Sequence, residues 1–128
     1  MTKSLVFRVR QIYFDAIVNE DKNIEYRKDS AYWQKRVFGM SASQYCGVMG
    51  IDESKTHFNL TITSKEIAER FGLLIGVFIC GKRLHRREVI KIQRIKTPDW
   101  FSEQGKRDVD TPTCLAFHLG KKILPKNY

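Results

Sequence analysis

The feature that most constrains the fold is an alternation of apolar and polar residues over short segments, which is the period of a half-buried β-strand. In segment 5–10 the apolar residues at 5, 7 and 9 lie on the face opposite the arginines at 8 and 10. In segment 113–119 two leucines and a phenylalanine alternate with Cys, Ala and His. Further strands are predicted at 23–27, 58–62, 73–80 and 89–95. The chain is therefore expected to be rich in β-structure.

Two other segments have the spacing of short helices. Segment 12–18 places its apolar residues on one helical face. Thr63 and Glu66 have the spacing of a capping box, and Gly72 is a natural end for the helix between them. Within 28–62 we predict one short helical turn and one strand. The predicted fold is α+β, a small, partly closed β-barrel of five or six strands with two or three short helices.

The chain shows no repeat, low-complexity tract or linker, so we interpret residues 1–128 as a single domain. Cys46, Cys80 and Cys114 are odd in number and widely spaced, which favours reduced thiols over a disulfide framework. The first ten residues lack the apolar core of a signal peptide, and no run approaches the roughly eighteen apolar residues that a membrane span requires. We expect a soluble, cytoplasmic protein.

Positive charge is concentrated in one segment. The chain has 23 Lys and Arg against 14 Asp and Glu, a formal charge of +9. Residues 82–96 hold seven basic residues and one acidic residue, which gives +6 of that total. Such a segment can neutralise several phosphates, although it could also be a solvated face with charges that protect a sheet edge. The candidate nucleic-acid contacts are Lys82, Arg83, Arg86, Arg87, Lys91 and Arg94, with Trp100 in the following loop.

A second charged pattern lies at the junction between the first helix and the next strand. Strand alternation puts Glu25 and Arg27 on one side, and Lys22 in the preceding turn can lean over that side. These three residues are candidates for a cleft that binds anionic or carbonyl oxygens and a base amino group. The alternative is an exposed ion pair of little consequence. Trp33 and Arg36 follow the pattern and are further candidate ligand contacts.

The charged pattern resembles the motif of the ASCH domain, a member of the PUA-like superfamily. That motif is written Gly-x-Lys-x-x-Glu-x-Arg, and Lys22, Glu25 and Arg27 match its three charged positions. Glu20 stands where the family usually has glycine, so we expect a differently shaped turn there.

The resemblance is most specific over residues 5–27 and looser over 73–119. Residues 30–70 are interpreted as an insertion. The resemblance implies a PUA-like β-barrel with a cleft beside the motif, and a role in RNA or nucleotide recognition.

Three functions remain open. The leading hypothesis is binding of a nucleic acid, RNA above all, or of a nucleotide or modified base. The first alternative is a small amidohydrolase that acts on N-acylated cytidine-type nucleosides, because some ASCH-like proteins have this activity. Lys22 and Glu25 would then be the catalytic residues, although this family's nucleophilic threonine is replaced by Glu25. The second alternative is a protein-interaction adaptor that uses residues 30–70. No metal or cofactor motif is found, and the oligomeric state is not predicted.

Overall fold

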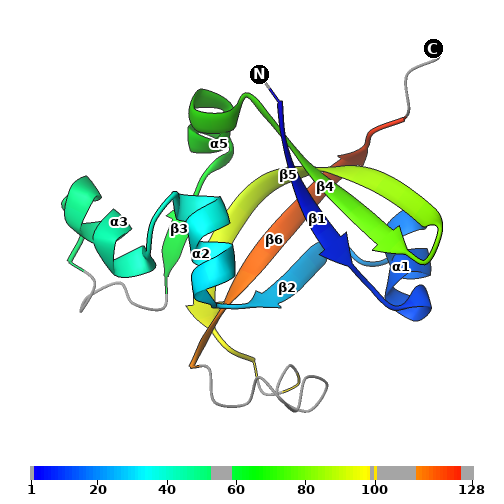
Figure 1. The fold of residues 1–128 in the computed structure, drawn as a ribbon, viewed down its shortest axis with the longest axis horizontal. Helices are drawn as coiled ribbons and strands as arrows, with labels where there is room; N and C mark the ends of the chain where they lie inside the picture. Colours follow the sequence, from blue (N-terminus) through cyan, green and yellow to red (C-terminus); the bar gives the residue numbers. More distant parts are fainter. Residues whose placement is uncertain (1, 53–58, 99, 101–111, 125–128) are drawn as a thin grey trace. The chain divides into compact units, whose positions relative to one another are not determined.

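The computed structural model describes residues 2–52, 59–98, 100 and 112–124. In chain order its elements are β1 (Thr2–Arg8), α1 (Gln11–Val18), β2 (Ile24–Lys28), α2 (Ala31–Phe38), α3 (Ala42–Met49), β3 (Leu60–Ile62), α5 (Ser64–Phe71), β4 (Leu73–Cys80), β5 (Arg83–Lys96) and β6 (Thr113–Lys122) (Figure 1). The predicted α+β class is confirmed.

The strands form a six-stranded mixed sheet in the order β1-β4-β5-β6-β2, with β3 also paired to β5. The first and fourth strands run parallel, from Thr2 opposite Leu73 to Arg8 opposite Ile79. The fourth and fifth strands run antiparallel. This order places β1 and β2 at the two ends of the path, and it does not confirm the predicted partial closure into a barrel.

The connection between β4 and β5 is shorter than the sequence predicted. The predicted strands 73–80 and 89–95 left residues 81–88 as their connection, but Gly81 and Lys82 alone link the observed strands and Arg83 already pairs with Cys80. Gly81 has φ +60°, the sign that a type II′ hairpin turn requires at its first central position. Residues 83–88 begin β5, but their many charged side chains give no alternation of apolar and polar residues, so the sequence did not predict a strand there.

The described part of segment 28–62 holds two helices of eight residues each, α2 and α3, where one helical turn was expected. The Ser30 hydroxyl caps the first helix by accepting a hydrogen bond from the Trp33 amide. Ser41 and Gln44 form a complete capping box at the second helix. Each helix therefore begins at a signal that lies in the sequence.

The ends of α5 agree with the sequence. The Thr63 side chain accepts from the Glu66 amide, and the Gly72 amide donates to the Ala68 carbonyl at the other end. The bond from the Glu66 amide to the Thr63 hydroxyl is one half of the predicted capping box. The Glu66 carboxylate makes a different contact, since it accepts from the Thr63 hydroxyl at 3.1 Å.

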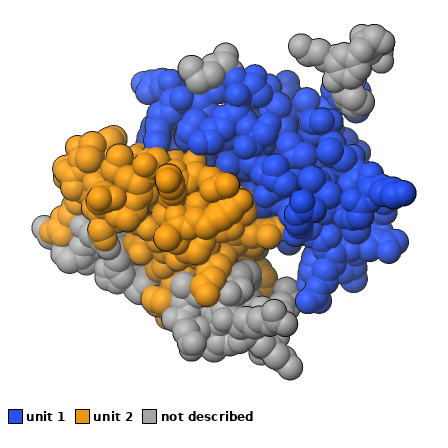
Figure 2. All heavy atoms as spheres, viewed as in Figure 1, with its two compact units in different colours: residues 1–25, 62–92, 117–128 blue, residues 26–61, 93–116 orange. Residues whose placement is uncertain are grey.

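The chain divides into two compact units (Figure 2). Unit 1 comprises Met1–Glu25, Ile62–Ile92 and Phe117–Tyr128, and unit 2 comprises Tyr26–Thr61 and Gln93–Ala116. In unit 1 the ring of Phe7 stacks on Phe78 and meets Phe117 edge-on, both at 5.0 Å between centroids. In unit 2 Phe38 and Tyr45 pack at 4.9 Å. Burying each such ring contributes about 1.5–3 kcal/mol.

All three cysteines are free thiols. Burial raises the pKa of the Cys114 thiol to about 11, so that residue is protonated and unreactive at neutral pH. Within the described parts of the chain, every helix is too short or too polar to cross a membrane.

Candidate functional site

Lys22 and Glu25 of unit 1 form an ion pair. The distance from Lys22 Nζ to Glu25 Oε1 is 3.1 Å. Glu25 is 5% exposed, while a quarter of the Lys22 side chain is open to solvent. The Lys22 ammonium also lies 4.8 Å from the centroid of the Tyr13 ring. The pair thus presents a positioned cation next to a shielded carboxylate, which is suited to holding a polar ligand group.

The turn that carries Lys22 has a left-handed residue. Glu20 has φ +65°, a conformation that costs a residue with a side chain about 1–2 kcal/mol. The Asn23 side-chain amide donates to the Glu20 carbonyl at 2.9 Å, and the Lys22 amide donates to the Ala16 carbonyl at 3.0 Å. We expected a differently shaped turn with glutamate in place of glycine. The backbone instead adopts the conformation that glycine favours.

Aromatic rings and guanidinium groups stack in unit 2. Arg36 Cζ lies 3.5 Å from the centroid of Tyr32, and the Tyr32 and Trp33 rings are stacked at 5.2 Å and 14°. Arg27 Cζ lies 5.9 Å from the Trp33 centroid. We call these four residues the aromatic–cation stack. The structure thus brings together three of the predicted ligand residues, Arg27, Trp33 and Arg36, and their convergence with the Lys22–Glu25 pair stays a prediction.

Trp100, a predicted nucleic-acid contact, lies in unit 2 and is 42% exposed. Its ring meets that of Tyr26 edge-on at 4.8 Å. Burial raises the pKa of the Tyr26 hydroxyl, so this phenol is neutral under ordinary conditions. Trp100 keeps enough open surface to contact a ligand.

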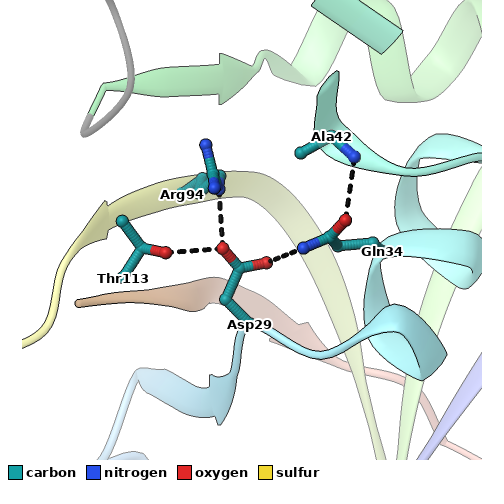
Figure 3. Close-up of polar contacts among 5 residues, drawn as sticks. All are labelled: Asp29, Gln34, Ala42, Arg94 and Thr113. Atoms are coloured by element: carbon teal, nitrogen blue, oxygen red, sulfur yellow. Dashed lines mark hydrogen bonds and ion pairs between the residues drawn. The ribbon is translucent and has the colours of Figure 1, made fainter. Parts of the chain in front are cut away.

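Arg94 was predicted to contact nucleic acid, and in the structure its side chain is paired with a carboxylate of the fold. Its side chain is 14% exposed, and its Nε lies 2.6 Å from Asp29 Oδ2 (Figure 3). The same oxygen accepts from the Thr113 hydroxyl at 2.6 Å, and the other carboxylate oxygen accepts from the Gln34 amide at 2.7 Å. Gln34 in turn accepts from the Ala42 amide at 2.8 Å. Arg94 is therefore part of a network that orders the start of α2 and α3.

Arg87 was also predicted to contact nucleic acid, and in the structure its guanidinium is enclosed by the fold. The residue is 2% exposed. Its Nε donates one hydrogen bond, Nη1 two and Nη2 three, all within unit 1. The acceptors are the carbonyls of Ile17, Lys22, Leu119 and Gly120 and the side-chain oxygen of Asn23. A guanidinium whose donors are occupied in this way does not neutralise a phosphate.

The other predicted basic contacts differ in their surroundings. Arg83 pairs with Asp15 at 3.0 Å and covers the Phe14 ring at 4.4 Å, although its side chain is half exposed. Lys82 is exposed, and Arg86 and Lys91 are half-buried. These residues remain candidates for phosphate contacts.

His85 of unit 1 lies beside Phe14, with ring centroids 6.5 Å apart. Burial lowers the pKa of its imidazole, as do the charges of Lys122 and Arg87, while Glu20 raises it. Its Nε2 atom is buried without a hydrogen-bond partner in the part of the chain that the structure describes. No group of three or more His, Cys, Asp or Glu able to hold a metal ion occurs among those same residues.

Sequence reasoning did not identify Tyr13, Asn23 or Asp29 as members of these clusters. Tyr13 and Asn23 gave no usable signal, because their partners are set by tertiary contacts. The N-cap signal of Ser30 could have placed Tyr32 and Arg36 four residues apart on one helix, where side chains meet.

No protein-family model, curated protein or solved structure matches the chain.

Proposed function

We propose that the protein binds single-stranded nucleic acid, RNA above all, or a nucleotide-like ligand. We also propose that its sheet forms part of a partly closed, ASCH-like barrel, as the motif implies. The observation that carries the proposal is the aromatic–cation stack, in which Arg36 covers a tyrosine that is 47% exposed. Planar cations and planar rings already stack there, which is the arrangement that nucleobases use on protein surfaces.

The stack offers a direct way to hold a base. A base is planar like the guanidinium that rests on Tyr32, so it can take the same orientation over the ring. The displaced Arg36 would then lie near the sugar–phosphate backbone, together with the exposed Lys35 of the same helix. Stacking on one ring contributes about 1–3 kcal/mol and tolerates any base.

The Lys22–Glu25 pair of unit 1 is a separate candidate for polar contacts in this proposal. The ammonium can donate to a base carbonyl or a phosphate oxygen, and the carboxylate can accept from a base amino group. Contacts of this kind distinguish bases, whereas backbone contacts do not.

The test measures binding of a fluorescent single-stranded RNA to the wild type and to Tyr32→Ala. We expect an affinity loss of about five- to 150-fold, which corresponds to about 1–3 kcal/mol for one stacked base. Val48→Ala is the control, because it removes an exposed apolar side chain from α3 of the same unit. Equal affinities for Tyr32→Ala and the wild type would contradict the stacking role, and no binding by the wild type would contradict the function.

A second candidate function, hydrolysis of an N-acylated cytidine-type nucleoside, is favoured by the same Lys22–Glu25 geometry. A carboxylate 3.1 Å from an ammonium can activate a water molecule while the ammonium stabilises the oxyanion that forms. The attack of water breaks the amide C–N bond and releases a carboxylic acid and the nucleoside amine. Acid release that is lost in Lys22→Ala and Glu25→Gln, at unchanged thermal stability, would support this candidate. Absence of turnover by the wild type would exclude it for the substrates tried.

A further inference from the structure

We infer that Arg87 is a positioning residue that fixes Lys22 for ligand contact, although it touches no ligand itself. This inference rests on the proposed function, because it assigns to Arg87 the placement of a group that the proposed ligand contacts. It concerns unit 1 alone.

The guanidinium of Arg87 ties together three points of the segment that leads into β2. Its Nη1 donates to the carbonyls of Ile17 at 3.3 Å and Lys22 at 2.8 Å. Its Nη2 donates to the side-chain oxygen of Asn23 at 2.7 Å. These contacts hold the end of α1, the turn and the residue before the strand around one planar group.

The other side of the guanidinium is anchored to β6. The Gly120 carbonyl accepts from Nε at 3.0 Å and from Nη2 at 2.8 Å. The Leu119 amide donates to the Asn23 carbonyl at 2.9 Å, so the same strand also holds the turn directly. The turn is therefore fixed to the sheet and cannot drift as an exposed loop would.

Both backbone polar groups of Lys22, its amide and its carbonyl, are held by hydrogen bonds. Its amide donates to Ala16 and its carbonyl accepts from Arg87, which leaves the side chain to lie between Glu25 and the Tyr13 ring. A lysine at position 87 has three donors on one atom and cannot reproduce the planar, forked pattern. The geometry thus requires arginine rather than positive charge alone.

The first arm of the test needs no ligand. The variant is Asn23→Ala, which removes from an exposed residue both the contact with Arg87 and the hydrogen bond to the Glu20 carbonyl, and leaves the other Arg87 contacts in place. Asn23→Asp is the control for the second bond, because it keeps the acceptor for Arg87 and loses only the donor to Glu20, and it should leave the Lys22 signal unchanged. We measure the NMR resonances of the Lys22 ε-methylene group, which the Tyr13 ring shifts upfield. We expect this shift to shrink in Asn23→Ala and in Arg87→Lys. Asn19→Ala, a change of the same type at the start of the same turn, should leave it unchanged. An unaltered Lys22 signal in folded Asn23→Ala would overturn the inference.

The second arm measures binding of short single-stranded RNA at several salt concentrations. We expect Asn23→Ala to weaken binding about tenfold, as the loss of an oriented polar contact does, while the salt slope stays at the wild-type value. A purely structural role would lower the unfolding midpoint of Asn23→Ala without changing the affinity of the folded protein, and this result would overturn the inference. If the wild type binds no RNA or nucleotide while the Lys22 signal still responds to Asn23→Ala, the proposed function fails and the placement of Lys22 by Arg87 stands.

Discussion

Replacing Arg87 with alanine should destabilise the protein far more than the loss of the neighbouring positive charge at Arg86. The reason is that a residue 2% exposed donates to five acceptor atoms drawn from two parts of unit 1. Alanine offers none of these donors.

The magnitude follows from the acceptors left behind. The carbonyls of Lys22 and Gly120 receive the shortest backbone bonds, 2.8 Å each. A buried carbonyl that loses its donor costs about 1–3 kcal/mol, so the two together give about 2–6 kcal/mol before water enters the space. We expect the free energy of unfolding to fall by about 3–5 kcal/mol, a large part of the 5–15 kcal/mol typical of a domain.

Urea unfolding at neutral pH measures this loss. With a slope of about 1.5 kcal/mol/M, the Arg87→Ala midpoint should fall by about 2–3 M. The matched control is Arg86→Ala, since it removes the same side chain from the preceding residue of β5. It should change the free energy of unfolding by no more than about 1 kcal/mol. If the two variants differ by less than about 1 kcal/mol, the buried hydrogen bonds do not carry the stability that we assign to them.

Three further predictions concern the charge, the backbone and the pH dependence. Lys82 and Arg86 remain available for phosphates, so their replacement together by alanine should reduce the magnitude of the salt slope of RNA binding by about 1.4, at about 0.7 per contact; an unchanged slope would show that they are only solvated. Gly120→Ala should destabilise the protein by about 1–3 kcal/mol, because the added methyl group would lie 2.7 Å from an isoleucine methyl. Gly47→Ala, in the middle of α3 with open space around it, should stabilise the protein by about 0.5–1 kcal/mol. In thermal melts the midpoint should therefore fall in Gly120→Ala and rise in Gly47→Ala. The pKa of His85 is lowered from its usual 6.5 by burial first, so the unfolded chain binds more protons and stability should fall as the pH drops through 6.5. Urea midpoints at about pH 7.5 and about pH 5.5 should differ less in His85→Leu than in the wild type.

Local patterns in the sequence predicted most of the sheet and two helices. Strand 73–80 was placed at its observed bounds, and the helix between Thr63 and Gly72 was found with the help of its caps. These elements were predictable because alternation and capping act between residues a few positions apart. Segment 28–62 was under-predicted, since its helices depend on caps at Ser30 and Ser41 that we did not weigh.

The sequence by itself determined the overall charge and the strand periodicity. Only the tertiary structure decided which cations are open to a phosphate. Arg87 and Arg94 look like their exposed neighbours in the sequence, yet their partners lie up to 70 and 65 residues away. An arginine can be buried when carbonyl or carboxylate oxygens surround its donors, and the fold alone brings those oxygens together.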